Sequence, residues 1–157
     1  MAGLSVYLLM TAIDVVGTTN GYPKDQWAEV KLIEAIGHVE SGMNYDAVGD
    51  SGKAKGAYQL HEAAWKDAQA YYKELAVKLP AYRFWRHPGY QYTAMVGFIR
   101  VCTKRMQAAG VKNPDPLQIY LCFSMGFAAF QEIGFKPDAA PKSKLSAANR
   151  VLNIFQK

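Results

Sequence analysis

Glu40 stands on the apolar face of a predicted helix, where a carboxyl group could act as a general acid. From Trp27 onward, apolar residues recur at spacings of three and four, and Glu40 follows Ile36 and Gly37 by one turn. Burial against such a face favours the protonated carboxyl, the form that general acid catalysis requires. Gly37 leaves space there for a ligand to approach. Taken alone, the pattern is more typical of a partly solvated glutamate at a helix end.

The residues after Glu40 extend this single carboxyl into a longer pattern. The chain continues as Glu40-Ser41-Gly42-Met43-Asn44, and a glycine-rich stretch over 47–60 ends in Gly56-Ala57-Tyr58-Gln59-Leu60. Three glycines in eight residues argue against a helix there, and Asp50-Ser51-Gly52 is typical of a turn, so we expect a short irregular hairpin. The order and spacing of these segments resemble the soluble lytic transglycosylase branch of the lysozyme superfamily.

The resemblance implies cleavage of the β-1,4 bond between N-acetylmuramic acid and N-acetylglucosamine in peptidoglycan. Glu40 would be the general acid and base of a lytic transglycosylase, which forms 1,6-anhydromuramic ends and needs one carboxyl group. The alternative is a lysozyme-type hydrolase in which Asp50, or less well Asp46, assists a water molecule. Asp50 can equally be a turn residue that caps its own backbone. A non-catalytic module that binds peptidoglycan, or a structural part of a virion or secretion machine, is the third reading.

Other candidate residues follow from the same resemblance. Ser41 would orient the acid or contact sugar, and Gln59 would offer its amide to sugar hydroxyl or acetamido groups. Tyr58 would stack on a sugar face or, equally well, pack in the core.

The resemblance weakens further along the chain. The family has Ala-Tyr-Asn-x-Gly on a central helix, whereas this chain has Cys122-Phe123-Ser124-Met125-Gly126. Ser124 therefore takes the asparagine position among the candidate substrate-binding residues. Tyr120, one turn away, could replace the family tyrosine that holds the acid and the substrate. The loss of that tyrosine and asparagine keeps the non-catalytic alternative open.

The elements that must position these residues are mainly helices. Residues 1–23 form an apolar N-terminal segment, either a signal remnant or a first helix, followed by a linker, and 24–157 form the lysozyme-like catalytic domain. Helices are predicted from an N-cap at Asp25 to Gly42, and over 62–78, 90–109, 117–133 and 146–155. The expected fold class is α+β, mainly α, with helices around a small β-hairpin and a substrate cleft.

The composition narrows the class of partner. The chain has 157 residues, 50% of them hydrophobic, and a net charge of +5, which fits one domain with a polyanionic partner. The uncharged run over 2–13 is too short to span a bilayer, which needs roughly 20 residues. With the motif above, we expect a monomer that binds peptidoglycan glycan strands, not nucleic acid, without stable membrane insertion. Such a protein would be periplasmic, secreted or virion-associated.

Metal and disulfide chemistry have little support in the sequence. The histidines, His38, His61 and His87, stand singly, and the chain has two cysteines, so we expect no metal site and no cofactor. Cys102 and Cys122 lie on apolar faces of predicted helices. They could form one disulfide, although buried free thiols are more typical of such positions.

Overall fold

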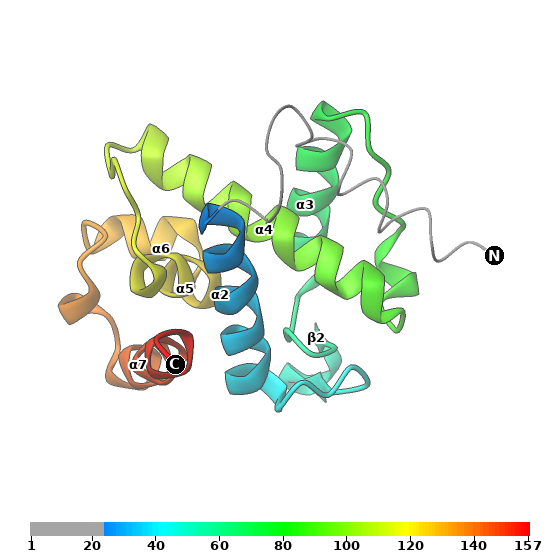
Figure 1. The fold of residues 1–157 in the computed structure, drawn as a ribbon, viewed down its shortest axis with the longest axis horizontal. Coiled ribbons are helices and arrows are strands. Elements are labelled where there is room, and N and C mark those ends of the chain that lie inside the picture. Colours follow the sequence, from blue (N-terminus) through cyan, green and yellow to red (C-terminus); the bar gives the residue numbers. More distant parts are fainter. Residues whose placement is uncertain (1–23) are drawn as a thin grey trace.

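The fold is mainly helical, as the sequence predicts. The computed structural model describes residues 24–157, and the predicted apolar segment and linker over 1–23 lie outside the described residues. The described part contains six α-helices and one two-stranded antiparallel sheet (Figure 1), which confirms the class α+β, mainly α. The helices are α2 (Lys24–Ser41), α3 (Glu62–Glu74), α4 (Pro88–Ala108), α5 (Pro116–Met125), α6 (Phe127–Glu132) and α7 (Lys142–Phe155).

The predicted hairpin over 47–60 is also confirmed. Its strands are β1 (Val48–Gly49) and β2 (Ala54–Lys55), joined by a 3-10 turn over Asp50–Gly52, and Val48 pairs with Lys55 in an antiparallel register. An isolated bridge between Lys55 and Leu60 folds the following loop back onto the hairpin. The loop therefore brings Gln59 beside the hairpin turn rather than away from it.

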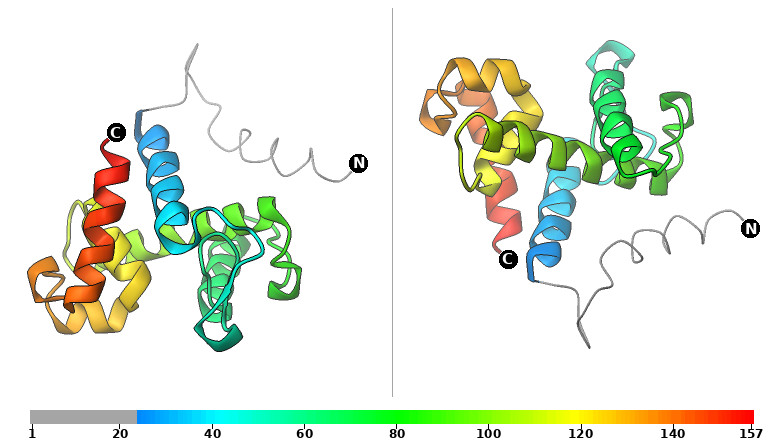
Figure 2. Two further views of the ribbon diagram at one scale, coloured as in Figure 1. Left: turned by 90° about the horizontal axis from the view of Figure 1, so that it is seen from below. Right: turned by 90° about the horizontal axis from the view of Figure 1, so that it is seen from above.

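The helix α2 separates two groups of elements. The hairpin and α3 lie on one side of its C-terminal half, and α5, α6 and α7 lie on the other side (Figure 2). The long helix α4 packs against α3 and α5 and so connects the two groups, while α7 packs against both α2 and α5. The C-terminal end of α2 therefore lies where both groups can contribute side chains.

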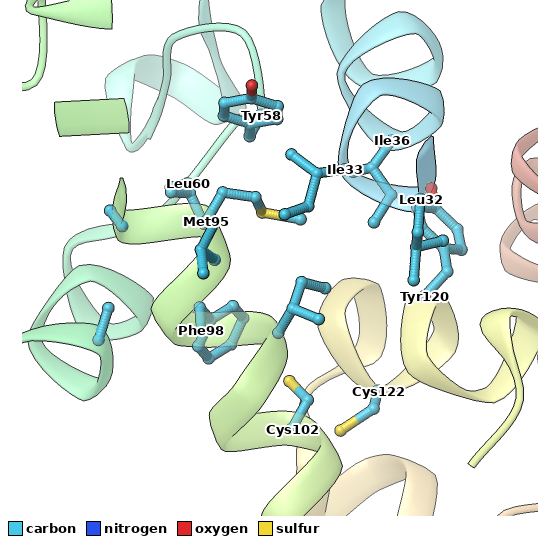
Figure 3. Packing of buried hydrophobic residues seen from close by; sticks show 14 of the residues in the cluster. Leu32, Ile33, Ile36, Tyr58, Leu60, Met95, Phe98, Cys102, Tyr120 and Cys122 are labelled. Atoms are coloured by element: carbon cyan, nitrogen blue, oxygen red, sulfur yellow. The ribbon is translucent and has the colours of Figure 1, made fainter. Parts of the chain in front are cut away.

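The core forms where α2, α4 and α5 meet. Ile33 and Ile36 of α2, Met95 of α4 and Tyr120 of α5 are all buried there (Figure 3). Such close packing of large apolar side chains fixes the relative positions of the three helices. The core thus holds the end of α2 rigidly against α5.

Cys102 and Cys122 are free thiols in the structure. They lie side by side where α4 meets α5 (Figure 3), and both are buried. Their mutual hydrogen bond and their burial raise the pKa of the Cys102 thiol well above its ordinary value. Of the two predicted alternatives, the structure therefore contains the buried free thiols.

Two predicted helix ends were wrong, each because of a local backbone conformation. The helix predicted over 62–78 ends at Glu74, since Ala76 adopts a positive φ of 56° and Val77 N–H donates to the carbonyl of Tyr72. The helix predicted over 117–133 is two helices, because Gly126 has φ 85° and ψ 148°, which no α-helix contains. This break turns α6 away from α5 and exposes the end of α5.

The predicted helix starts were displaced as well. The first helix already includes Lys24, so Asp25 lies inside it and is not its N-cap. The helix predicted from 90 begins at Pro88, where the fixed φ of proline suits a first turn. The last helix begins at Lys142, four residues before the predicted start at Ser146. That extra turn places Lys144 on a helix rather than in a loop.

Candidate active site

Glu40 lies in the last turn of α2, where the helix is ended by glycine geometry. Gly42 adopts a positive φ of 65°, and Met43 N–H donates to the carbonyl of Gly37 at 3.0 Å. A residue with this conformation after the last turn is a common way to end a helix. Glu40 is half-buried. The predicted end at Gly42 is thus confirmed, and the chain turns sharply into the hairpin immediately after the carboxyl group.

Tyr120 holds one oxygen of this carboxyl group. Its hydroxyl donates a 2.7 Å hydrogen bond to Oε1 of Glu40, although the two residues are 80 positions apart in the sequence. The helix α5 that carries Tyr120 begins with a capping box of Asp115 and Gln118, with Pro116 in its first turn. The N-terminal end of α5 is therefore well defined, and the core packing around Tyr120 fixes its ring.

The phenol of Tyr120 remains a donor over the ordinary pH range. Its side chain is only 2% exposed, and burial, followed by the negative charge of Glu40, raises the pKa of Tyr120 far above its usual value near 10. Because the phenol keeps its proton, Oε1 of Glu40 must act as the acceptor. A proton on the carboxyl group is then carried by Oε2, which has no hydrogen-bond partner among the side chains and backbone described over 28–157. The pair can present a proton in one fixed direction.

Glu40 faces a cleft of about 640 Å³ between the two groups of elements. Polar residues from both sides reach this cleft, together with apolar side chains at its base. Its lining is Glu40, Asp50, Ala54, Gln59, Leu60, His61, Ala64, Phe98, Phe123, Ser124, Met125, Gly126 and Lys144. The structure thus brings four predicted site residues, Glu40, Asp50, Gln59 and Ser124, to one cavity.

Asp50 is both a turn residue and part of the cleft lining. It lies in the hairpin turn with φ 46°, and its side chain pairs with His61 instead of capping its own backbone. Oδ2 of Asp50 is 3.2 Å from Nε2 of His61, and both side chains are about half exposed. An exposed pair of this kind contributes little stability. It does engage the Asp50 carboxylate, and it adds His61 to the lining of the cleft.

Asp46, the second candidate for assisting a water molecule, does not line the cleft. Its backbone N–H donates to Oδ1 of Asn44 at 3.0 Å, which makes a turn typical of asparagine. The structure therefore gives Asp46 a place in the loop before the hairpin.

Ser41 bonds to the hairpin loop and not to Glu40. Its Oγ donates to the carbonyl of Ala57 at 2.7 Å and accepts from the N–H of Asn44 at 3.0 Å. It does not line the cleft. Neither predicted role, orienting the acid or contacting sugar, is seen in these contacts, and Ser41 instead fixes the end of α2 to the segment that carries Gln59.

Gln59 lines the cleft in a strained backbone conformation. Its φ is 48°, and its Nε2 donates to the carbonyl of Gly56 at 3.0 Å. The side chain packs so closely on Gly49 that a Cβ there would overlap Oε1 of Gln59. This explains the glycine in β1 without reference to a ligand, and it holds the Gln59 amide against the hairpin.

Tyr58 packs in the core and does not line the cleft. Its side chain is 1% exposed, which matches the core-packing alternative. The packing of Tyr58 also explains why position 37 is a glycine. A Cβ at Gly37 would overlap Met43 and lie 3.0 Å from the Tyr58 ring. The expectation that Gly37 leaves room for a ligand was wrong, since protein side chains fill that space.

Ser124 and Lys144 form one corner of the cleft. Oγ of Ser124 is buried and has no hydrogen-bond partner in the part described with side chains, 28–157, whereas the Ser124 carbonyl accepts a 2.7 Å bond from Nζ of Lys144. The Gly126 break exposes this carbonyl at the end of α5. Lys144 was missed in the sequence, because nothing in its neighbourhood marks a lysine in α7 as part of a site formed by α2 and α5.

The buried side chain of Gln91 fastens the hairpin to α4. Its Oε1 accepts from the N–H of Ala57 and its Nε2 donates to the carbonyl of Tyr45, each at 2.8 Å. The replacement Gln91→Leu leaves both backbone groups without partners, so we expect a loss of about 2 to 3 kcal/mol in the free energy of unfolding. Denaturant titration measures this. The exposed Gln107→Leu on the same helix should change it by less than about 0.5 kcal/mol, and equal losses would contradict this role.

Tyr82 connects the 3-10 turn after α3 to the hairpin. Its hydroxyl lies 2.9 Å from the carbonyl oxygen of Lys53 and 3.0 Å from that of Leu60, and it shares its proton between them. Burial, and then the charge of Glu62, raises the pKa of Tyr82 from 10.0 to about 12. The folded state therefore favours the neutral phenol.

A difference in alkaline stability between wild type and Tyr82→Phe should report this raised pKa. The folded pKa is above the unfolded one, so the contribution to stability is complete below pH 10 and is lost as the pH rises toward about 12. Thermal melting of both proteins from pH 8 to 12 measures it. Below pH 10 we expect the wild type to melt at a higher temperature than Tyr82→Phe, and above pH 10 we expect this difference in melting temperature to disappear. A constant gap would contradict the shift.

No helix among the described residues is long and apolar enough to cross a membrane. Where side chains are described, over 28–157, no group of three or more His, Cys, Asp or Glu residues is arranged to hold a metal ion. Comparison of the chain with family models, with curated proteins and with solved structures gives no significant match in any of the three.

Proposed function

We propose that this chain is a peptidoglycan-cleaving glycosidase with a lysozyme-like fold, and that it acts as a lytic transglycosylase. The observation that carries the proposal is the hydrogen bond from Tyr120 to Glu40 at the wall of the cleft. This bond supplies the tyrosine contact that the family motif led us to seek, although from a position one turn earlier in the helix. Tyr120 thus gives Glu40 the hydrogen-bond donor that Phe123 and Ser124, at the positions of the family's tyrosine and asparagine, do not supply.

In the proposed reaction Glu40 takes part in two proton transfers: it first gives a proton and then takes another. The protonated carboxyl group gives its proton to the glycosidic oxygen as the bond from that oxygen to C1 of the muramic residue breaks. The resulting carboxylate takes the proton from the 6-hydroxyl of the same muramic residue, and that oxygen bonds to C1. Glu40 ends protonated, and the sugar ends as a 1,6-anhydro ring with no water consumed.

The rest of the cleft suits a sugar polymer. Gln59 and His61 bring hydrogen-bond donors and acceptors from the hairpin side. Phe98 and Phe123 form an apolar surface, with their ring centroids 6.1 Å apart in an edge-to-face contact. Polar groups that fix orientation over an apolar floor are typical of carbohydrate and other small-ligand sites.

The hydrolase remains a second candidate because Asp50 lines the same cleft as Glu40. The replacement Asp50→Asn distinguishes the two: a transglycosylase should keep most of its rate, whereas a hydrolase that uses Asp50 should lose it.

The test of the proposal is mass spectrometry of purified peptidoglycan after incubation with the protein. Muropeptides ending in 1,6-anhydromuramic acid would support transglycosylation, and reducing ends would favour the hydrolase. If nothing is released, the non-catalytic module is the better reading, and binding to insoluble peptidoglycan would then be measured by sedimentation. Release that is unchanged by Glu40→Gln would overturn the assignment of the acid.

The expected setting follows from the substrate. Peptidoglycan lies outside the cytoplasmic membrane, so we propose an extracytoplasmic monomer that reaches its polyanionic partner with a net charge of +5. Adsorption of this kind should weaken as salt is added.

A further inference from the structure

Lys144 carries a positive charge into the cleft without an acidic partner. It lies in the first turns of α7, it is half-buried, and it lines the cavity. One of its three ammonium protons is used by the carbonyl of Ser124, 2.7 Å away. Among residues 28–157, whose side chains the structure describes, no carboxylate lies within ion-pair distance of its Nζ. Two donors of a partly desolvated cation are therefore free for a ligand.

The other charged groups of the cleft already have partners. Glu40 accepts from Tyr120, and Asp50 is paired with His61 on the hairpin side. Lys144 belongs to α7, which lies with α5 and α6 on the opposite side of α2 (Figure 2). The cleft thus has the Asp50–His61 pair on one side and a cation without an acidic partner on the other.

The surroundings of Lys144 strengthen its attraction for anions. Residues 133–157 hold five lysine and arginine residues and a single acidic residue, Asp138. Apart from Lys144 these cations, Lys136, Lys142, Arg150 and Lys157, are all exposed. The segment that carries Lys144 is therefore strongly basic, with five cations against one carboxylate.

We propose that Lys144 is a specificity-determining residue that binds a carboxylate of the peptide stem carried by the muramic residue of the substrate. The inference rests on the proposed function, because it takes that glycan as the occupant of the cleft. In a glycan with stems the lactyl carboxyl group of the muramic residue is held in the amide bond to the peptide, so the free carboxylates belong to the stem peptide. An ammonium group with two free donors selects for such a carboxylate, through a charge-assisted hydrogen bond.

The test measures binding and uses Glu40→Gln protein, so that no substrate is consumed. Two ligands are compared by calorimetry: a soluble peptidoglycan fragment with its stem peptides, and the same fragment after its stem carboxylates have been converted to amides. We expect the fragment with free carboxylates to bind about tenfold more tightly, and we expect added salt to reduce that preference.

Second-site variants assign the preference to Lys144. Adding Lys144→Met should abolish it, whereas Lys144→Arg, which keeps the charge and the donor to Ser124, should retain it. The matched control Lys142→Met removes an equal charge from the same helix outside the cleft and should also retain it. If Lys144→Met binds both ligands more weakly by the same factor, or keeps the preference, the inference is overturned. The melting temperature of each variant shows whether the corner at Ser124 is intact.

Failure of this inference can be told apart from failure of the proposed function. A wild-type protein that releases anhydro muropeptides but shows no preference dependent on Lys144 overturns the inference alone. A protein that shows this preference but cleaves nothing overturns the catalytic proposal alone, and binding of neither ligand overturns both.

Discussion

Replacing Glu40 with glutamine should lower the rate of peptidoglycan cleavage by about a thousandfold. A positioned general acid and base contributes roughly 10²- to 10⁴-fold to a rate, and the amide can neither give nor accept the transferred proton. The fold should survive, because the amide oxygen can still accept from Tyr120. The initial rate of muropeptide release measures the first effect, and thermal melting measures the second.

The matched control for this replacement is Glu34→Gln. Glu34 lies on the same helix, is exposed, and does not line the cleft, so this variant changes the charge by the same amount. Its rate should stay within about twofold of the wild type. A Glu40→Gln protein that is folded and retains more than a tenth of the wild-type rate would show that another group supplies the proton.

Replacing Tyr120 with phenylalanine should lower kcat by about ten- to a hundredfold and leave KM nearly unchanged. The phenol is a positioning group, which is 2% exposed and contacts the acid rather than the cleft. A hydrogen bond to a charged partner contributes about 1.5 to 3 kcal/mol. Its loss would let the carboxyl group rotate and would remove the donor that stabilises the carboxylate. Steady-state rates over a range of soluble muropeptide concentrations separate kcat from KM.

Tyr72→Phe is the control for this second prediction. The hydroxyl of Tyr72 is also buried and donates to a carbonyl, that of Thr93 at 3.1 Å, but Tyr72 does not line the cleft or contact Glu40. Both variants should lose stability, by about 1 kcal/mol each, and only Tyr120→Phe should lose kcat. Equal losses of kcat in the two variants would indicate a general loss of packing instead of a specific effect on the acid.

The parts of the site that lie close together in the sequence could be predicted from it. Glu40 follows from helical periodicity and Gly42 from helix-end chemistry, and both expectations match the structure. The hairpin follows from the local density of glycine, and it brings Asp50 and Gln59 to the cleft. In each case a short segment contains enough information to fix its own backbone.

Contacts between distant segments could not be predicted in this way. Tyr120 reaches Glu40 across 80 positions, and Lys144 reaches the carbonyl of Ser124 from another helix. Both contacts depend on how α5 and α7 pack against α2, which no local pattern encodes. The positive φ of Ala76, which ends α3, is likewise unmarked, because alanine is ordinarily a strong helix former. A glycine such as Gly126 is a signal for a helix break, but the almost uncharged sequence over 117–133 favoured the prediction of one continuous helix.

The most direct test of the central claim is digestion of peptidoglycan in water that carries an isotopic label on its oxygen. If Glu40 transfers its proton to the leaving oxygen and then takes one from the sugar's own hydroxyl, no solvent oxygen enters the product. The released muropeptides should then carry unlabelled 1,6-anhydro ends, and their mass should be the same in labelled and ordinary water. Labelled oxygen at the new muramic ends would contradict the account, because it would show that water, and not the sugar hydroxyl, attacks C1.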